Sequence, residues 1–302
     1  MHQTTRMILD KKVPFSYIFR KIRKDLVFIL LVGIVFNYVA NLFSAHLPEM
    51  PLNVPTFLGT AISILLSFKM SQSYDRWWEA RKVWGAIVND SRSLTLQLEH
   101  YLGDDKEAVR TIAFRQIAWC YSLGQSLRGL DPLEDLTRLL TEKDIAAISR
   151  HNNKPLAILQ LNTADIRRLK QQGRLDTIQQ AQLDQTFVRL CDAMGKAERI
   201  NATVFPVTYR MFLHFAIYLF VITLSIALRN IAPLFEIPLL VLISSVFLLL
   251  EKTAYHLQDP FRNRPSDIPV TAIARTIEIN IRQLLGAEDV PKPAASDTFY
   301  IL

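Results

Sequence analysis

Four stretches of the chain approach the length of a membrane-spanning helix, which needs about 20 predominantly apolar residues. In chain order they are Leu26 to Phe43, Phe57 to Met70, Phe205 to Leu228 and Leu234 to Leu250. This pattern predicts four transmembrane helices. The first stretch is the clearest of them, because it is long and carries no charged residue.

The second stretch is marginal by itself, because Pro51 and Pro55 precede it and Lys69 lies near its end. No proline or further glycine interrupts the chain between Gly59 and Gly85, so one helix can leave the membrane and continue. Beyond the membrane its apolar residues recur every three or four positions, which is typical of a buried helix face. They are Trp77, Trp84, Ile87, Leu94, Leu98 and Tyr101.

The region between the second and third stretches also predicts helices, because it contains no useful length of strand-like alternation. Thr141 followed by Asp144, and Asn162 followed by Asp165, have the spacing of side chains that cap the N-terminus of a helix. Gly173 is a candidate helix end. The expected fold class is therefore all-α.

The expected organisation has four parts. Residues 1–70 hold an N-terminal flank and the first two transmembrane helices, and residues 71–204 form a helical region outside the membrane. Residues 205–250 hold the last two transmembrane helices, and residues 251–302 form a C-terminal segment. We expect the membrane helices to be continuous with the helical region.

The distribution of basic residues predicts the orientation. The chain has 35 Lys and Arg against 28 Asp and Glu, a net charge of +7. Basic residues are retained on the cytoplasmic side of a membrane. The flank before the first stretch is rich in Lys and Arg, the loop 44–54 has none, and the turn between the last two stretches has only Arg229. We therefore expect a multi-pass protein of the plasma membrane, the inner membrane in a Gram-negative bacterium, with both termini and the helical region 71–204 cytoplasmic.

The two cysteines, Cys120 and Cys191, lie far apart, and neither belongs to a CxxC motif or to a metal-ligand spacing. We expect both to be reduced, buried packing residues.

The chain has no GxxxxGK, GxGxxG, HExxH or GxSxG motif, so we expect neither an enzyme nor a cofactor. Glu251, His256 and Asp259 are the polar group at the end of the fourth stretch, where they form either a metal site or an interfacial cap. Arg210 and His214 lie one turn apart in the third stretch. Such residues either serve function or extend to the membrane surface in a structural role.

Three segments resemble the bestrophin family of ion channels, and the chain looks like a bacterial member of it. They are Ser73 to Arg92, with the run SYDRWWEARKVWGAIVNDSR, Asn201 to Phe220, and Glu251 to Val270. The two tryptophans of the RWW run suit either an aromatic belt at the membrane surface or helix packing. The family signature falls on Arg76, Trp77, Trp78, Asp259, Pro260 and Phe261.

The resemblance implies a homopentamer around a central pore, with the second helix lining a narrow neck. The implied partners are four further copies of the chain, membrane lipids and permeant monovalent ions, without nucleic acid. Aligning on the RWW run carries the neck onto Thr60, Ile64 and Phe68, and Thr60 departs from the hydrophobic residue usual in the family. Ile178 matches the second, cytoplasmic aperture.

Calcium regulation is not expected. Eukaryotic bestrophins carry an acidic run after the Asn-Pro-Phe segment, and Ca²⁺ needs six to eight oxygen ligands. Here the matching segment is followed by Arg262 and Arg264, which leaves only Asp259 and Asp267 as carboxylates nearby. This departure from the family pattern therefore predicts a calcium-independent channel.

The predicted neck contains hydroxyl, aliphatic and aromatic groups but no basic ring. This composition favours small monovalent cations. Because eukaryotic relatives conduct anions, a chloride channel of the same fold is the alternative, and a membrane scaffold or signalling protein is the alternative from another class.

Overall fold

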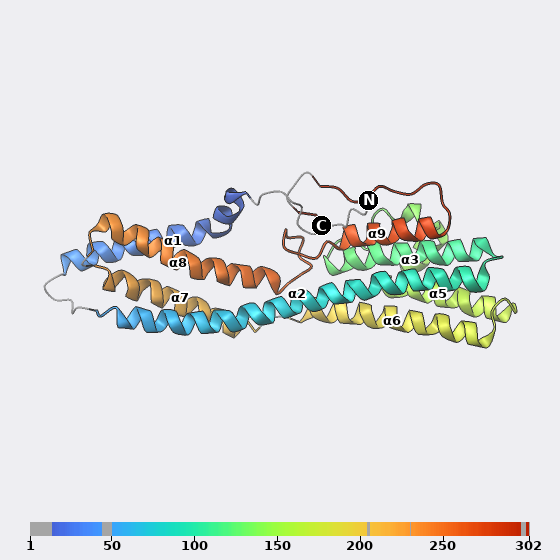
Figure 1. The fold of residues 1–302 in the computed structure, drawn as a ribbon, viewed down its shortest axis with the longest axis horizontal. Coiled ribbons are helices and arrows are strands. Elements are labelled where there is room, and N and C mark those ends of the chain that lie inside the picture. The colour runs from blue at the N-terminus through green and yellow to red at the C-terminus, as the bar shows by residue number, and fades with distance from the viewer. Residues whose placement is uncertain (1–13, 44–49, 204–205, 230, 297–299, 302) are drawn as a thin grey trace. The chain divides into compact units, whose positions relative to one another are not determined.

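The structure is a computed structural model that describes residues 14–43, 50–203, 206–229, 231–296 and 300–301. Its regular structure within these residues is helical, which confirms the all-α prediction (Figure 1). The elements are α1 (Phe15–Leu42), α2 (Asn53–Leu102), α3 (Lys106–Leu127), the 3-10 turn η1 (Leu136–Arg138), α4 (Glu142–Ile148), α5 (Lys154–Gln171), α6 (Thr177–Ala202), α7 (Val207–Ala227), α8 (Pro233–Leu257) and α9 (Val270–Leu284).

The chain divides into two compact units. Residues 12–76 and 204–259 form one unit, here called the membrane unit, and residues 77–203 and 260–302 belong to the other, here called the globular unit. The helix α2 supplies residues to both, as expected for a membrane helix that continues into the helical region.

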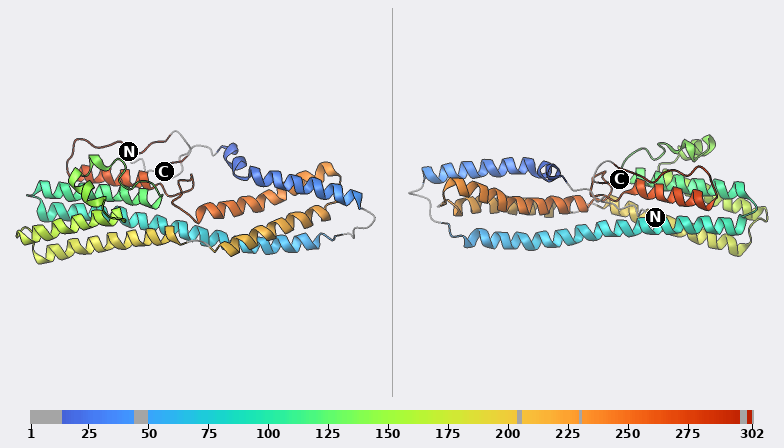
Figure 2. Two further views of the ribbon diagram at one scale, coloured as in Figure 1. Left: turned by 180° about the vertical axis from the view of Figure 1, so that it is seen from behind. Right: turned by 45° about the horizontal axis from the view of Figure 1, so that its top comes forward.

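The membrane unit is a bundle in which α1 contacts α7 and α8, and α7 contacts α8 (Figures 1 and 2). Its interior is aliphatic and aromatic and includes Ile62, Leu66, Ile217 and Phe220. A Cβ atom built on Gly59 would lie 3.1 Å from the Phe220 ring, so the absence of a side chain allows α2 and α7 to approach closely here.

The outside of the membrane unit is also apolar. Phe57 is 74% exposed and Leu234 is 77% exposed, and many other large apolar side chains on α1, α2, α7 and α8 are exposed as well. Apolar surface on this scale is rare on soluble monomers and marks contact with lipid or with another protein. This surface agrees with a membrane location.

Within the described residues, three helices are long and apolar enough to cross a membrane: α2, α7 and α8. These helices correspond to the second, third and fourth apolar stretches. The crossing predicted for α1 is not among the three and stays a prediction.

The described residues of the globular unit pack around one hydrophobic core. Its largest fully buried side chains include Trp84 and Trp119. The predicted apolar stripe of α2 is confirmed, since Trp84, Ile87, Leu94 and Leu98 have no exposed surface. Trp77 and Tyr101, at the two ends of the stripe, are partly buried against the same core.

The local signals at Thr141 and Gly173 are confirmed. Thr141 begins α4 with a capping box in which its side chain accepts from the Asp144 N–H. Gly173 follows α5 with a φ of +73°, the left-handed conformation that favours glycine after a helix. The helix start predicted at Asn162 is wrong, because α5 begins at Lys154, capped by Asn153, and the buried Asn162 side chain lies inside the helix.

The prediction for the cysteines is half right. Cys120 is fully buried, and burial raises the pKa of its thiol to about 12. Cys191 is exposed, contrary to the prediction, because the buried face of α6 recurs at Leu190, Met194 and Ala197 and Cys191 lies outside that spacing.

Candidate functional site

The predicted neck residues share one face of α2. Thr60, Ile64 and Phe68 follow each other at intervals of four residues, which is close to one helical turn. All three are exposed in the single chain, and the exposed fractions of Ile64 and Phe68 are 54% and 62%. The Thr60 hydroxyl donates to the Thr56 carbonyl oxygen at 2.9 Å, so it is bound within its own helix.

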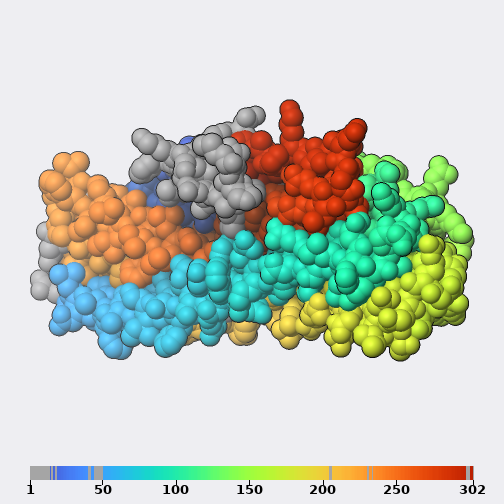
Figure 3. Space-filling view, turned by 45° about the vertical axis from the view of Figure 1, so that its right-hand side comes forward, coloured from blue at the N-terminus to red at the C-terminus, as the bar shows by residue number. Residues whose placement is uncertain are grey.

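The opposite face of the same segment is buried. Ile62, Leu66 and Lys69 are each at most 2% exposed, and the Tyr209 hydroxyl of α7 donates to the Leu65 carbonyl oxygen at 2.7 Å. Figure 3 shows that the first half of α2, coloured blue to cyan, forms part of the surface on the face in view. Ile64 is therefore not a core residue of the single chain, and the same holds for Phe68.

A buried ion pair lies on the buried face of this segment of α2, opposite the exposed stripe formed by Thr60, Ile64 and Phe68. The Lys69 Nζ atom is 2.7 Å from Glu251 Oε1, and both side chains are almost fully buried. The other carboxylate oxygen of Glu251 is 3.7 Å from His214 Nε2. An unpaired charge in this interior would be very costly, so Lys69 and Glu251 each depend on the other to remain buried.

Sequence reasoning grouped Glu251 differently, with His256 and Asp259. In the structure the Glu251 carboxylate faces Lys69 and His214 instead. No group of three His, Cys, Asp or Glu side chains within the described ranges is placed to hold a metal ion. Lys69 and Glu251 each lie near the end of an apolar stretch, and this was the signal that could have paired them.

Arg210 and His214 are local partners within α7. His214 Nδ1 lies 2.9 Å from the Arg210 carbonyl oxygen, and the Arg210 guanidinium lies over the ring of Tyr255, 5.6 Å from its centroid. Both side chains are partly exposed and line a groove on the membrane unit.

The signature residues hold the segment between α8 and α9. Arg76 Nε donates to the Gln258 carbonyl oxygen at 2.9 Å in the membrane unit. In the globular unit Trp77 Nε1 donates to the Ser266 carbonyl oxygen at 3.0 Å, and Phe261 is 1% exposed. Trp77 therefore acts in packing, whereas Trp78 remains 47% exposed.

The loop after Phe261 is closed by Asp267. One oxygen of its carboxylate accepts from the backbone N–H groups of Arg262 at 2.5 Å and Arg264 at 3.0 Å. Burial raises the pKa of Asp267, although these hydrogen bonds and nearby arginines oppose the change. One of the two carboxylates expected near this segment is thus already used to shape the loop.

The residue matched to the cytoplasmic aperture, Ile178, lies in the first turn of α6. A capping box between Asp176 and Gln179 fixes this turn. Ile178 is 75% exposed, an unusual position for a large aliphatic side chain. Its role as an aperture stays a prediction.

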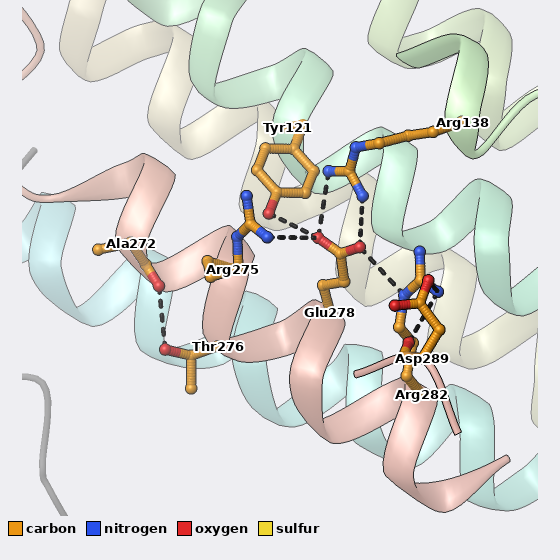
Figure 4. Close-up of polar contacts among 8 residues, drawn as sticks. All are labelled: Tyr121, Arg138, Ala272, Arg275, Thr276, Glu278, Arg282 and Asp289. Carbon is orange, nitrogen blue, oxygen red and sulfur yellow. Dashed lines mark hydrogen bonds and ion pairs between the residues drawn. The ribbon is translucent and has the colours of Figure 1, made fainter. Parts of the chain in front are cut away.

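A second buried ionic cluster lies in the globular unit and was missed by sequence reasoning (Figure 4). The fully buried Glu278 of α9 accepts from the Tyr121 hydroxyl at 2.8 Å and from two nitrogens of Arg138. Arg282 Nε donates to it at 3.1 Å, and Arg275 lies 4.0 Å away. The cluster joins α9 to α3 and to the turn η1.

The electrostatics of this cluster stabilise the charged carboxylate. Burial by itself raises the pKa of Glu278, but hydrogen bonds from Arg138 and Tyr121 and the positive charges around it outweigh burial, so the pKa is lowered. Tyr121 responds in the opposite direction: burial and the hydrogen bond to Glu278 raise its pKa.

These features define a helical membrane protein in which one long helix passes from an apolar bundle into a folded helical unit. The family described as "Bacterial/Fungal Bestrophin protein" matches residues 5–283. The chain belongs to this family, which confirms the resemblance found in the sequence.

Individual relatives agree. A bacterial bestrophin homologue from Klebsiella pneumoniae, of known structure, is 31% identical, with a TM-score of 0.84 over 89% of this chain and 100% of that chain. The "voltage-dependent anion channel-forming protein" YneE of Escherichia coli is 32% identical, covering 82% of this chain and 81% of YneE. A protein of Ralstonia nicotianae with the same description is 28% identical, covering 88% of this chain and 89% of the relative. The Escherichia coli and Ralstonia relatives are named as channel-forming proteins, in agreement with the prediction that the chain is not an enzyme.

Proposed function

We propose that copies of this chain assemble into an ion channel whose pore is lined by α2. The observation that carries the proposal is the exposed stripe of Thr60, Ile64 and Phe68, which leaves two large apolar side chains uncovered although the opposite face of the helix is buried. One helix cannot enclose an ion path, so the stripe needs symmetry mates around it. The family resemblance supports five copies.

In such an assembly each stripe residue is repeated as a ring. Ile64 and Phe68 then form two apolar rings about 6 Å apart along the pore. Apolar constrictions impede ions by width and by dewetting, because the wall offers few groups to replace the hydration shell. The stripe therefore acts as a neck, and Ile178 is the candidate for a second narrow point.

Anion selectivity and cation selectivity are each supported by a different observation. The descriptions of the Escherichia coli and Ralstonia relatives favour anion conduction and oppose the cation preference inferred from the neck. The geometry supports cations as the second candidate through Asp75. It is exposed seven residues after Phe68, close to two turns along, and so lies on the same face of α2. A ring of carboxylates at the pore would attract cations.

Recordings from the purified protein in planar lipid bilayers test both whether the protein is a channel and which ions it conducts. A channel gives discrete currents, and a scaffold gives none. Reversal potentials in asymmetric salt distinguish anions from cations. If Asp75 sets a cation preference, Asp75→Asn shifts the permeability ratio towards anions. The matched control is Glu99→Gln, an exposed carboxylate on α2 about 6.7 turns further along and on a different face.

The orientation, with both termini and residues 71–204 cytoplasmic, is part of the proposal and rests on the Lys and Arg asymmetry. A single cysteine at Ser296 should resist a membrane-impermeant thiol reagent in intact cells. Cys191 has to be replaced first because it is exposed. Labelling of Ser296→Cys in intact cells would contradict the orientation.

A further inference from the structure

The buried ion pair between Lys69 and Glu251 lies in the membrane unit, one residue along α2 from the neck residue Phe68. Successive residues of a helix are about 100° apart around its axis, so the direction of Lys69 fixes the direction of Phe68. The Lys69 side chain has no exposed surface and is enclosed on the face of α2 that packs against the bundle. The lysine and the exposed neck residues are therefore carried by neighbouring turns of one helix and rotate together.

The pair ties α2 to two other helices of the bundle. Lys69 Nζ lies 2.7 Å from Glu251 Oε1 of α8, and the second carboxylate oxygen lies 3.7 Å from His214 Nε2 of α7. His214 is itself held within α7, because its Nδ1 atom lies 2.9 Å from the Arg210 carbonyl oxygen. The place of the carboxylate is thus defined by α7 and α8, and the lysine joins α2 to it.

The ion pair depends on the rotation of α2 more strongly than the apolar contacts around it. Apolar attraction is non-directional and follows the area that is buried. An ion pair in a low-dielectric interior weakens steeply as its two atoms separate, and a buried charge left unpaired is costly. A rotation of α2 that turns Phe68 away from its present direction also carries Lys69 Nζ away from Glu251. The ion pair therefore opposes this rotation.

A second tie to the same segment of α2 is less sensitive to rotation. The Tyr209 hydroxyl of α7 donates to the Leu65 carbonyl oxygen at 2.7 Å. The backbone of a helix lies near its axis, with Cα atoms about 2.3 Å away, whereas Lys69 Nζ lies at the end of a long side chain. The same rotation therefore moves the lysine nitrogen further than the carbonyl oxygen. The Tyr209 hydrogen bond holds α2 in place, and the Lys69 ion pair holds its rotation.

We infer that Lys69 and Glu251 are positioning residues for the neck, because their ion pair sets the rotation of α2 and so keeps Ile64 and Phe68 directed at the pore. The inference rests on the proposed function, since it takes the exposed stripe of α2 to face other copies across a pore. It goes beyond that function by giving a role in conduction to two buried residues that no permeating ion contacts.

The central test variant is Lys69→Met with Glu251→Gln, which removes both charges and leaves side chains of similar length. Because no unpaired charge stays buried, the double variant should fold and assemble, but α2 loses its directional tie. The matched control is Glu236→Gln, the same change at another fully buried carboxylate of α8. The Glu236 carboxylate accepts from Asn37 of α1 at 2.6 Å, so this change does not touch the contact with α2.

Single-channel recording and spin-label distances between copies give two separate readouts. In the double variant the single-channel conductance should change at least about two-fold or split into several levels, because the apolar rings lose their fixed width. A spin label at Gln72→Cys, one turn after Phe68 and exposed, is introduced after replacement of the exposed Cys191. Its distance distribution should become roughly two-fold broader, because several rotations of α2 are then populated. Both readouts should be unaltered in Glu236→Gln.

An assembled double variant with unaltered conductance and an unaltered distance distribution would overturn the inference, because the pair would then serve stability alone. Loss of the assembled oligomer on size-exclusion chromatography would overturn it too, since the pair would then be needed for the fold. So would a Glu236→Gln variant that changes both readouts as much as the double variant does. If the distances behave as expected but the unaltered protein gives no current, ion conduction is refuted and the positioning of α2 stands.

Discussion

The two halves of α2 differ in whether their large apolar side chains are buried. In the membrane unit the helix exposes Ile64 and Phe68 and buries the charged Lys69. In the globular unit it buries Trp84 and Leu94 completely. The difference shows that apolar residues on this helix have two kinds of surroundings. In the globular unit the chain's own core covers them, whereas in the membrane unit they are left for lipid or a neighbouring copy to cover.

The two units also bury charge differently. In the membrane unit Glu251 has one lysine at 2.7 Å and one histidine at 3.7 Å. In the globular unit Glu278 receives hydrogen bonds from Tyr121 and two arginines. The membrane pair is therefore the more fragile arrangement, since the loss of a single partner removes most of its compensation.

The largest expected effect concerns the half of α2 that is buried in the globular unit. Trp84→Ala should destabilise the protein by about 3–5 kcal/mol, because it empties a fully buried site in the globular core. The control Trp78→Ala removes the same side chain six positions earlier, where it is 47% exposed, and should cost much less. Denaturant unfolding monitored by circular dichroism measures both. Similar losses in the two variants would show that exposure in the single chain does not report burial in the assembly.

Breaking the buried pair should have a comparable effect in the membrane unit. Lys69→Met leaves Glu251 buried without its cation, which should cost about 3–5 kcal/mol. Adding Glu251→Gln removes the orphaned charge and should restore part of the loss in thermal unfolding. Lys82→Met, which removes an exposed lysine from the same helix, is the control. A double variant as unstable as Lys69→Met would mean that packing, not charge, accounts for the loss.

The neck prediction follows from the exposed stripe. Ile64→Ala, Phe68→Ala and the double change should raise single-channel conductance roughly two-fold or more, because they widen an apolar constriction. They should barely affect stability within one chain, whereas Leu66→Ala on the buried face should cost about 2–5 kcal/mol without widening the pore. Size-exclusion chromatography checks assembly. Intact oligomers with unaltered conductance and selectivity would refute the neck assignment.

The globular cluster predicts a pH dependence. Because the pKa of Glu278 is lowered below its ordinary value of 4.5, its stabilising effect is complete above that value and is lost as pH falls through the lowered native pKa. The difference in melting temperature between the unaltered protein and Glu278→Gln should therefore shrink as the pH falls below about 5. Glu99→Gln, at an exposed site, should show no such trend. A difference that grows as the pH falls would reverse the sign of the argument.

The smallest expected effect is that of calcium. Arg262 and Arg264 stand where calcium-binding relatives carry carboxylates, and Asp267 is engaged with the backbone of its own loop. Currents recorded in a calcium chelator and in added micromolar Ca²⁺ should agree closely. A steep, saturable activation would require oxygen ligands from another part of the chain.

The sequence by itself determined the helical fold, the apolar stretches and the buried stripe of α2. These features are periodic along the chain, and the period of a helix converts spacing directly into faces. The family resemblance added the neck positions, and the structure places Thr60, Ile64 and Phe68 on one exposed face without testing their role.

Only the tertiary structure decided which charges meet. Lys69 and Glu251 are 182 residues apart, and Tyr121 and Glu278 are 157 apart, so no local spacing links either pair. Because local spacing does not report contacts between distant helices, the sequence groups Glu251 with its neighbours along the chain and predicts that Cys191 is buried. A pairing between distant helices depends on how the bundle packs, and packing depends on shape and volume that a pattern of residue types does not contain.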